Sequence, residues 1–178
     1  MITSTRMLLM AGVACAAMGG RAALAQVPEG REYPCYRLAG APAIDGKLDD
    51  GCWESVPGAT GFRILSNDPN ASRYAIKKQT SFRMGWTDRA VYLAVRCIEP
   101  DMAKVRSNNA GKLWFKASVE LFLSPGNERT GYYQLAASWD GAQWSGVKAD
   151  GELEVRDDVS WKVKPGVWRN GWTLEAMI

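Results

Sequence analysis

The chain has 178 residues, with 22 lysines and arginines against 19 aspartates and glutamates, and it contains no histidine. A net charge this close to zero argues against nucleic-acid binding, which requires a basic face, and against binding to an anionic membrane surface. The lack of histidine excludes Ser-His-Asp and Cys-His nucleophiles and histidine ligands to metal or haem. Carboxylates, lysine or tyrosine remain for any catalysis.

The first 25 residues have the pattern of a secretory signal peptide. Arg6 supplies the positive charge, residues 7–18 are apolar but too few to span a bilayer, and Ala23-Leu24-Ala25 is an A-x-A cleavage site. Although Cys15 raises the question of a lipid anchor, apolar sequence continues past it, which favours soluble export. We therefore expect residues 26–178 to form one exported domain, periplasmic or extracellular.

Beyond the leader, short apolar runs separated by Gly, Pro, Asn and Asp are typical of an all-β protein. Residues 33–38 and Ala43-Ile44 are expected to be extended. Residues 45–53 then form a corner in which Asp45-Gly46 reverse the chain, because glycine tolerates positive φ. A helical turn follows; Asp49 or Asp50 is expected to cap it, and Leu48 and Trp53 to pack it onto an apolar layer.

The next segments read as antiparallel strands in chain order. Alternating apolar residues predict a hairpin of residues 79–86 and 91–98. A strand over 118–123 follows, with Val119, Leu121 and Leu123 facing inward. Two more strands, 131–139 and 142–147, flank Asp140-Gly141, a two-residue hairpin signal. Further strands are expected over 159–163 and 172–178, with residues 148–158 as a solvated loop or hairpin tip.

The last segment alternates as a half-buried strand and stops on Ile178 with no polar tail. Natural termini usually fray into solvent, and a sandwich closed by this strand would have an unpaired edge. The pattern favours a fragment of a longer protein, with a C-terminally incomplete domain.

Three cysteines follow the leader: Cys35, Cys52 and Cys97. An exported domain can carry a disulfide, and three cysteines allow one pair plus a free thiol. The sequence does not choose the pair, and the spacing is not that of a zinc site.

The eight tryptophans raise two interpretations, because their faces stack on sugar rings but also fill cores. Periodicity assigns Trp53, Trp86 and Trp172 to the core. Trp114 sits in a loop just before a strand and suits either role. Trp139 and Trp144 flank the Asp-Gly turn and can be exposed or paired across it. Glu120 lies on the outer face of its strand with Ser118 and Phe122.

Several segments, taken in order, resemble the family 9 carbohydrate-binding modules, secreted DOMON-like sandwiches attached to xylanases. They are Ile44-Asp45-Gly46-Lys47-Leu48-Asp49-Asp50 with Trp53, Arg83–Asp88 running into Val91-Tyr92-Leu93, Trp114 with Ser118–Leu123, Gly131–Gln134, and Gly171–Glu175. The resemblance spans roughly residues 35–178. It implies an antiparallel β-sandwich of the immunoglobulin or jelly-roll kind that lacks its final strands in this chain.

The resemblance also implies a binding site. In sugar-binding members two tryptophans clamp a terminal sugar and polar side chains grip its hydroxyls. Trp114 falls on the first clamp position and Glu120 on a sugar-gripping acid. Ala117 stands where an Asp is expected, and Ala136 where an Arg would help to bind sugar.

Calcium is bound by some members of the family. The acidic residues at the corner, Asp45, Asp49 and Asp50, are oxygen donors of the kind that calcium uses, but turn and cap roles explain them equally well.

The leading hypothesis is a secreted, non-catalytic module that binds mono-, oligo- or polysaccharide ends by aromatic stacking, in the service of carbohydrate catabolism. The alternative is a fragment of a glycoside hydrolase whose catalytic part lies downstream, since the chain has many carboxylates but no recognisable Asp/Glu pair. A haem-binding sandwich would need Met or Cys as the axial ligand and is the third hypothesis.

Overall fold

The computed structural model describes residues 32–62, 76, 78–107, 113, 116–125, 131–149, 151–156 and 158–178. Within these residues, nine strands form two sheets, accompanied by the short helix α1 (Met102–Ser107) and the 3-10 turn η1 (Gly51–Trp53). None of the helical segments described is long and apolar enough to cross a membrane. The leader at 1–25 lies outside the described residues.

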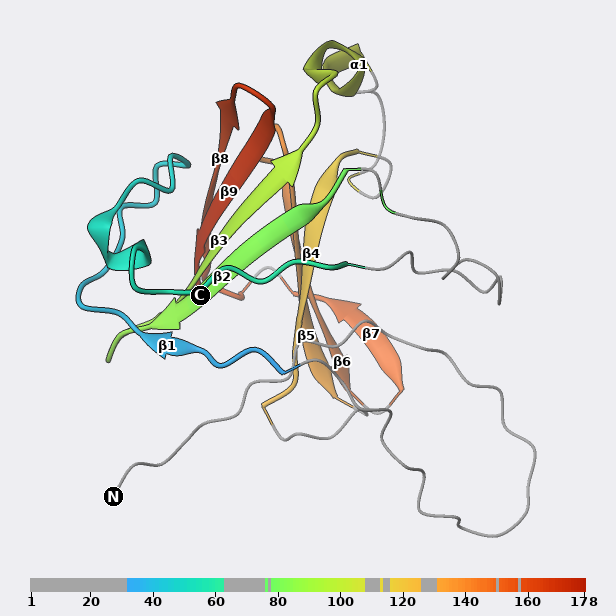
Figure 1. Ribbon diagram of the computed structural model, residues 1–178. Coiled ribbons are helices and arrows are strands. Elements are labelled where there is room, and N and C mark those ends of the chain that lie inside the picture. The colour runs from blue at the N-terminus through green and yellow to red at the C-terminus, as the bar shows by residue number, and fades with distance from the viewer. Residues whose placement is uncertain are drawn as a thin grey trace, which may run out of the picture.

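The larger sheet has five strands in the order β1-β2-β3-β9-β8 (Figure 1). Its members are β1 (Tyr36–Arg37), β2 (Thr80–Trp86), β3 (Val91–Ile98), β8 (Lys162–Trp168) and β9 (Gly171–Met177). Only β1 runs parallel to its neighbour; β2, β3, β9 and β8 pair antiparallel.

The smaller sheet has four antiparallel strands in chain order. They are β4 (Ser118–Leu123), β5 (Tyr132–Ser138), β6 (Gln143–Ala149) and β7 (Glu152–Val155). The expected strand over 118–123 and its inward face are confirmed, because Leu121 is buried in the core while Val119 and Leu123 pack against it.

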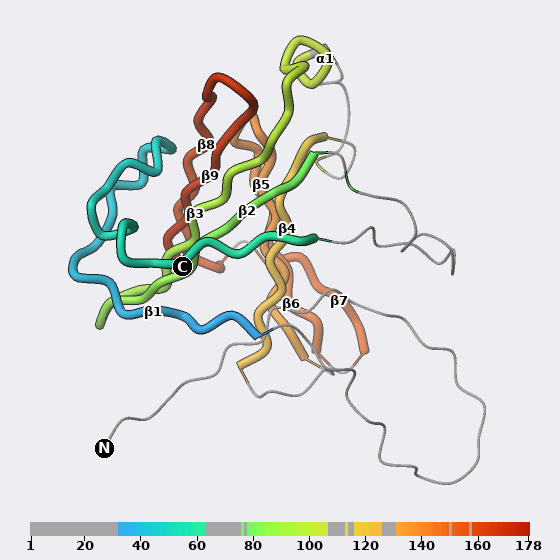
Figure 2. Tube along the Cα trace, viewed as in Figure 1, coloured from blue at the N-terminus to red at the C-terminus, as the bar shows by residue number. Residues whose placement is uncertain are grey.

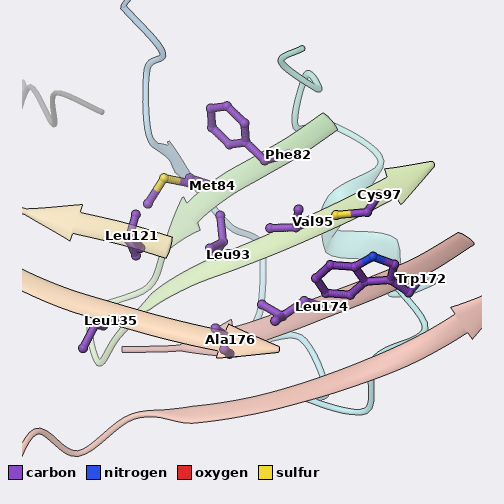
Figure 3. Packing of buried hydrophobic residues seen from close by; sticks show 11 residues of the cluster. Phe82, Met84, Leu93, Val95, Cys97, Leu121, Leu135, Trp172, Leu174 and Ala176 are labelled. Carbon is purple, nitrogen blue, oxygen red and sulfur yellow. The ribbon is translucent and has the colours of Figure 1, made fainter. Parts of the chain in front are cut away.

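The main core lies between the two sheets, so the fold is the expected β-sandwich. Figure 3 shows side chains from β2, β3 and β9 meeting those of β4 and β5. Burial of each large apolar side chain stabilises the fold by about 1.5–3 kcal/mol. The buried members are Phe82, Met84, Leu93, Val95, Cys97, Leu121, Leu135, Ala137, Trp172, Leu174 and Ala176.

A second apolar cluster covers the outer face of the five-stranded sheet. Leu48, Trp53 and Val56 pack there on Tyr92 and Ala94 of β3, with Leu38. The predicted packing of the 45–53 corner is thereby confirmed. It also explains why β3 is buried on both faces, whereas alternation alone predicts a buried face only for Val91, Leu93, Val95 and Cys97.

The capping predicted for the helical turn of this corner differs in the structure. Asp50 takes the position before η1, but its side chain makes no capping hydrogen bond, and its Oδ2 is buried without a hydrogen-bond partner in the part of the chain that the structure describes. Residues 43–44 do not form a strand either. This segment lies over the sheet face, where the ladder partners of an extended strand are not available to it.

Of the two alternatives expected for residues 148–158, the hairpin is observed: residues 152–155 form β7, which pairs with β6 and has the charged residues expected of an edge strand. Two other elements differ from the predictions. The strand expected at 159–163 is β8 at 162–168, which tolerates Pro165 because it too is an edge strand. Helix α1 was not predicted, although Asp101 provides a cap: its Oδ1 accepts the Lys104 N–H at 3.0 Å.

The final strand is not at an edge. β9 lies between β3 and β8 and pairs with both, so the unpaired edge expected from this strand is wrong. Figure 2 shows β9 next to β3, which comes from the middle of the chain. The sequence of β9 alternates because its two faces pack differently. One face packs on the core between the sheets, and the other packs on residues 44–56.

Two of the three tryptophans assigned to the core are buried: Trp53 and Trp172 are 2% and 3% exposed. Trp86 is not. It is 37% exposed, at the end of β2, and the guanidinium of Arg37 lies 5.2 Å from its ring centroid. Its position at the strand end takes it past the core that buries Phe82 and Met84, and a cation–π contact replaces burial.

All three cysteines after the leader are free thiols in this structure. Cys97 lies in the core, and burial raises its pKa to about 11. No disulfide pair is formed from Cys35, Cys52 and Cys97.

Candidate functional site

Of the two residues predicted to bind ligand, the structure describes only one. Trp114 lies outside the described residues. Glu120 is exposed in the middle of β4, on the face of the smaller sheet that points away from the core. β4 is an edge strand of this sheet, and β5, β6 and β7 follow it in order (Figure 1). The site can therefore be built outward from Glu120.

Glu120 begins a row that crosses three strands. It pairs with Ala136 of β5, and Ala136 pairs with Trp144 of β6. Residues that pair directly across antiparallel strands present their side chains on the same face. Glu120 and Trp144 therefore face the same side of the sheet, with only a methyl group between them.

The next row supplies a polar partner. Gln134 of β5 pairs with Phe122, and its Nε2 donates to Glu120 Oε2 at 2.9 Å. Gln134 is only 9% exposed. The amide fixes one carboxylate oxygen of Glu120 and leaves the other without a hydrogen bond from any described residue, which suits a hydroxyl donor.

Aromatic rings line one end of this face. The rings of Phe122 and Tyr132 meet edge to face with centroids 5.4 Å apart, and the ammonium of Lys148 lies 5.7 Å from the Tyr132 centroid. All three are half-buried. The face thus combines π surface, a carboxylate, an amide and an ammonium, the groups that bind polyhydroxylated ligands.

The two departures from the family pattern have clear positions. Ala136 is fully buried at 0% exposure, so the row has a small, covered residue where an arginine is expected. Ala117 comes just before β4, is half-buried and packs against the core. Its carbonyl accepts the Trp139 N–H at 3.0 Å.

A charged cluster holds the β5–β6 turn beside this face. Lys116 Nζ donates to Asp140 Oδ2 at 2.7 Å, and the Ser138 hydroxyl donates to Asp140 Oδ1. Together they lower the pKa of Asp140 to about 2. Asp140 is an anchor of the turn, bound to groups of this chain.

The acidic residues of the corner do not gather around a common point. Asp45 accepts the backbone N–H and the ammonium of Lys47 at 3.0 and 2.7 Å, the turn role rather than the ligand role. Among the described residues no three His, Cys, Asp or Glu side chains are grouped to hold a metal ion. Calcium binding stays a prediction from the family alone.

Sequence reasoning missed a buried carboxylate that explains the corner. Glu175 of β9 is 0% exposed; its Oε2 accepts the backbone N–H groups of Asp45 and Gly46 at 3.1 and 2.8 Å. Its Oε1 accepts the Trp53 indole N–H at 3.4 Å. The segments 44–53 and 171–175 are thus held together by hydrogen bonds to one buried carboxylate.

Sequence reasoning also missed the neighbours of Glu120. Phe122 follows from alternation along β4, but Gln134 and Trp144 depend on the pairing of three strands. The signal that sets the β5–β6 pairing is the turn at Asp140-Gly141, and its length decides which face Trp144 occupies.

A two-sheet sandwich with an aromatic and polar outer face defines a binding domain of the β-sandwich class. Residues 44–178 match the family model described as carbohydrate family 9 binding domain-like. The chain belongs to this family.

Related proteins agree with this assignment. The chain is 28% identical over 97 residues to Exoglucanase XynX of Acetivibrio thermocellus and 31% identical over 99 residues to Endo-1,4-beta-xylanase A of Thermoanaerobacterium saccharolyticum. Each match covers 54% of this chain, but only 8% and 7% of the two enzymes.

Solved structures show the same fold. A carbohydrate-binding module of family 9 from Caldicellulosiruptor kristjanssonii, in complex with glucose, superposes with a TM-score of 0.59 at 20% identity, covering 80% of this chain and 66% of that one. The same module in complex with cellotriose gives 0.58 at 18% identity, covering 81% and 66%.

Proposed function

We propose that this chain is a non-catalytic module that binds saccharide chain ends by ring stacking and hydrogen bonding. The observation that carries the proposal is the outer face of the smaller sheet, where Glu120 is oriented by Gln134 among half-buried aromatic rings. Membership of the family, and the glucose and cellotriose bound by its structural neighbours, support a saccharide as the ligand.

The chemistry follows from the groups on this face. A pyranose presents C–H bonds that pack on an aromatic face, while its rim hydroxyls reach polar side chains. Glu120 accepts a hydrogen bond from a sugar hydroxyl through the carboxylate oxygen that no described residue contacts. Trp114, as the family resemblance implies, supplies a stacking ring.

Isothermal titration of the purified chain with glucose, cellotriose and xylotriose tests this function. We expect Trp114→Ala to abolish the heat of binding and Glu120→Gln to weaken binding about tenfold, since a hydrogen bond to a charged group contributes about 1.5–3 kcal/mol. Glu152→Gln, an exposed acid at the start of β7, is the matched control. If the wild-type chain gives no heat with any of these sugars, the proposal fails.

The proposal includes export and a catalytic neighbour. The pattern of residues 1–25 supports secretion to the periplasm or beyond, and the enzymes matched by this chain support a polysaccharide-degrading part elsewhere in the same protein. N-terminal sequencing of the secreted protein, with Gln26 as the expected first residue, tests export. Reading the coding sequence past residue 178 tests the catalytic neighbour.

A further inference from the structure

We propose that the five-stranded sheet carries, on its outer face, a pocket that binds a small oxyanion through Arg83 of β2 and Arg96 of β3. The ligand is a carboxylate or phosphate group, either the acidic group of a substituted sugar or a free anion of the same chemistry. This pocket is separate from the face of Glu120, because it lies on the other sheet. It therefore adds a ligand class to the saccharide proposed above.

Alternation along β2 and β3 puts both arginines on the outer face of this sheet. Phe82 and Val95 face the core, so their neighbours Arg83 and Arg96 face the opposite side. Arg83 pairs with Ala94, which comes two residues before Arg96. Such diagonal neighbours lie about 7–8 Å apart across an antiparallel pair, a spacing that lets two guanidinium groups reach one anion.

Both arginines line a pocket of about 70 Å³. Two small residues share it: Ala94, and Ser81, whose hydroxyl can donate a further hydrogen bond. Leu48 and Gly58 border it from the segment that lies over the side of this sheet away from β4–β7 (Figure 1). Because a single buried water needs about 10–15 Å³, the pocket has room for a carboxylate or phosphate group.

The pocket is positively charged. Among the described residues that line it, two are arginines and none is acidic. In the part of the chain that the structure describes, neither guanidinium forms an ion pair, whereas Arg37 of the same sheet pairs with Asp88. Glu175 faces the same side from β9, but its carboxylate already accepts N–H groups of the 45–53 corner. Neighbouring cations repel each other, and an oxyanion between them removes that repulsion.

Arg83 is held in place for this role. Its Nε donates to the Val56 carbonyl at 2.9 Å, and the residue is half-buried. The described residues offer no hydrogen-bond acceptor to its two terminal nitrogens. A guanidinium that is fixed at Nε can present these remaining N–H groups to an oxyanion as charge-assisted hydrogen bonds.

Arg96 supplies an adjustable second cation. It lines the pocket, while its guanidinium carbon lies 5.1 Å from the centroid of the Trp168 ring. Arg96 is exposed, and a cation–π contact at an exposed site is weak. The guanidinium can therefore turn from the ring toward an anion bound at Arg83. This movement changes the surroundings of the Trp168 indole and hence its fluorescence.

Isothermal titration at fixed low ionic strength tests the pocket with sodium phosphate, with glucuronate and with glucose as the neutral match. We expect both anions to bind, and Arg83→Gln and Arg96→Gln to lower their affinity about tenfold or more, since each variant removes charge-assisted hydrogen bonds. The matched control is Arg37→Gln, which removes the same charge from a guanidinium that already pairs with Asp88; its anion affinity should not change. Tighter binding of glucuronate identifies an acidic sugar as the source of the oxyanion, and tighter binding of phosphate identifies a free anion.

Two further measurements separate lost binding from lost folding. Ser81→Leu fills the pocket but keeps both arginines, so it should lose anion affinity at unchanged net charge and unfolding temperature. Phosphate should change the tryptophan fluorescence of the wild-type chain and not that of Trp168→Phe.

A wild-type chain that binds neither anion would overturn the inference. So would Arg96→Gln and Ser81→Leu variants that bind both anions like the wild type, or an equal loss of affinity in Arg37→Gln, which would indicate a diffuse charge effect. The proposed function has a different readout: wild-type protein that binds phosphate or glucuronate but neither glucose nor cellotriose would overturn that function and leave the oxyanion pocket standing.

Discussion

At the scale of single residues, Glu175 decides how the N-terminal corner attaches to the sandwich. Its buried carboxylate accepts N–H groups from three residues far away in sequence. Burial raises its pKa, because desolvation of the charge outweighs the stabilising hydrogen bonds. Glu175 thus stabilises the fold as a hydrogen-bond acceptor more than as a charged group.

The acceptor role of Glu175 predicts that its substitutions differ in their effect on the free energy of unfolding. Glu175→Leu leaves two backbone N–H groups and the Trp53 indole N–H buried without an acceptor, at about 1–3 kcal/mol for each such group. Glu175→Gln keeps an amide oxygen for the two backbone groups, so its free energy of unfolding should stay much closer to that of the wild type. Urea unfolding at pH 7 measures both; equal losses would contradict the acceptor role.

The pH dependence has a definite sign. A raised native pKa means that the folded state holds the proton of Glu175 more tightly, so this group favours folding most at low pH and costs stability as pH rises above its usual pKa. Because glutamine does not titrate, the stability of Glu175→Gln relative to the wild type should improve from pH 4 to pH 7.

At the scale of elements, the β5–β6 hairpin shows where sequence reasoning stops. Asp140-Gly141 correctly marks the turn, and Gly141 has φ +88°. However, Ser138 N–H donates to Ala142 O at 2.9 Å and Gly141 N–H donates to Ser138 O at 3.0 Å, which is a three-residue loop rather than the expected two-residue turn.

This single extra residue has a large consequence. With a two-residue turn Trp144 would pair with Ala137, which faces the core; in the structure it pairs with Ala136 and faces outward with Glu120. Alternation within a strand could be predicted from sequence, as β3 and β4 show. The register between strands could not, because side chains such as Lys116 and Ser138 choose the turn geometry through Asp140.

The same cluster predicts acid sensitivity of the hairpin. Because the native pKa of Asp140 is about 2, below its usual value near 4, its contribution is present above pH 4 and is lost as pH falls toward 2. We expect Asp140→Asn to lower the free energy of unfolding by roughly 1–2 kcal/mol at pH 7, since the Asp140 side chain pairs with Lys116, and the two side chains are only 21% and 12% exposed.

Chemical unfolding between pH 2 and pH 7 checks this expectation. The difference between wild type and Asp140→Asn should shrink as the pH approaches 2. Asp158→Asn removes an acid whose ion pair with Arg156 is exposed to solvent and should show little effect at any pH. A constant difference for Asp140→Asn across this range would mean that Asp140 acts through something other than its charge.

At the scale of the whole molecule, the sandwich is closed by chain segments that are distant in sequence. β9 is central because the 171–177 segment inserts between β3 and β8, and its outer face is covered by residues 44–56. Both motifs, Ile44–Trp53 and Gly171–Glu175, are recognisable in the sequence as signatures of the family. Their contact is not predictable from the sequence, since only the three-dimensional pairing brings Glu175 to Gly46.

Cys97 reports on the integrity of this closed sandwich. Its thiol is 8% exposed, lies in the core between the sheets and has a pKa raised to about 11, so little thiolate exists at pH 8 and reagents cannot reach it. We expect iodoacetamide to label Cys97 far more slowly than the half-buried Cys35 and Cys52, as read by mass spectrometry of the individual peptides. Urea should speed the labelling of Cys97 in parallel with the loss of tertiary structure, because the thiol becomes accessible only when the two sheets separate. Labelling of Cys97 in native protein at the rate of Cys52 would show that the sheets part locally without global unfolding.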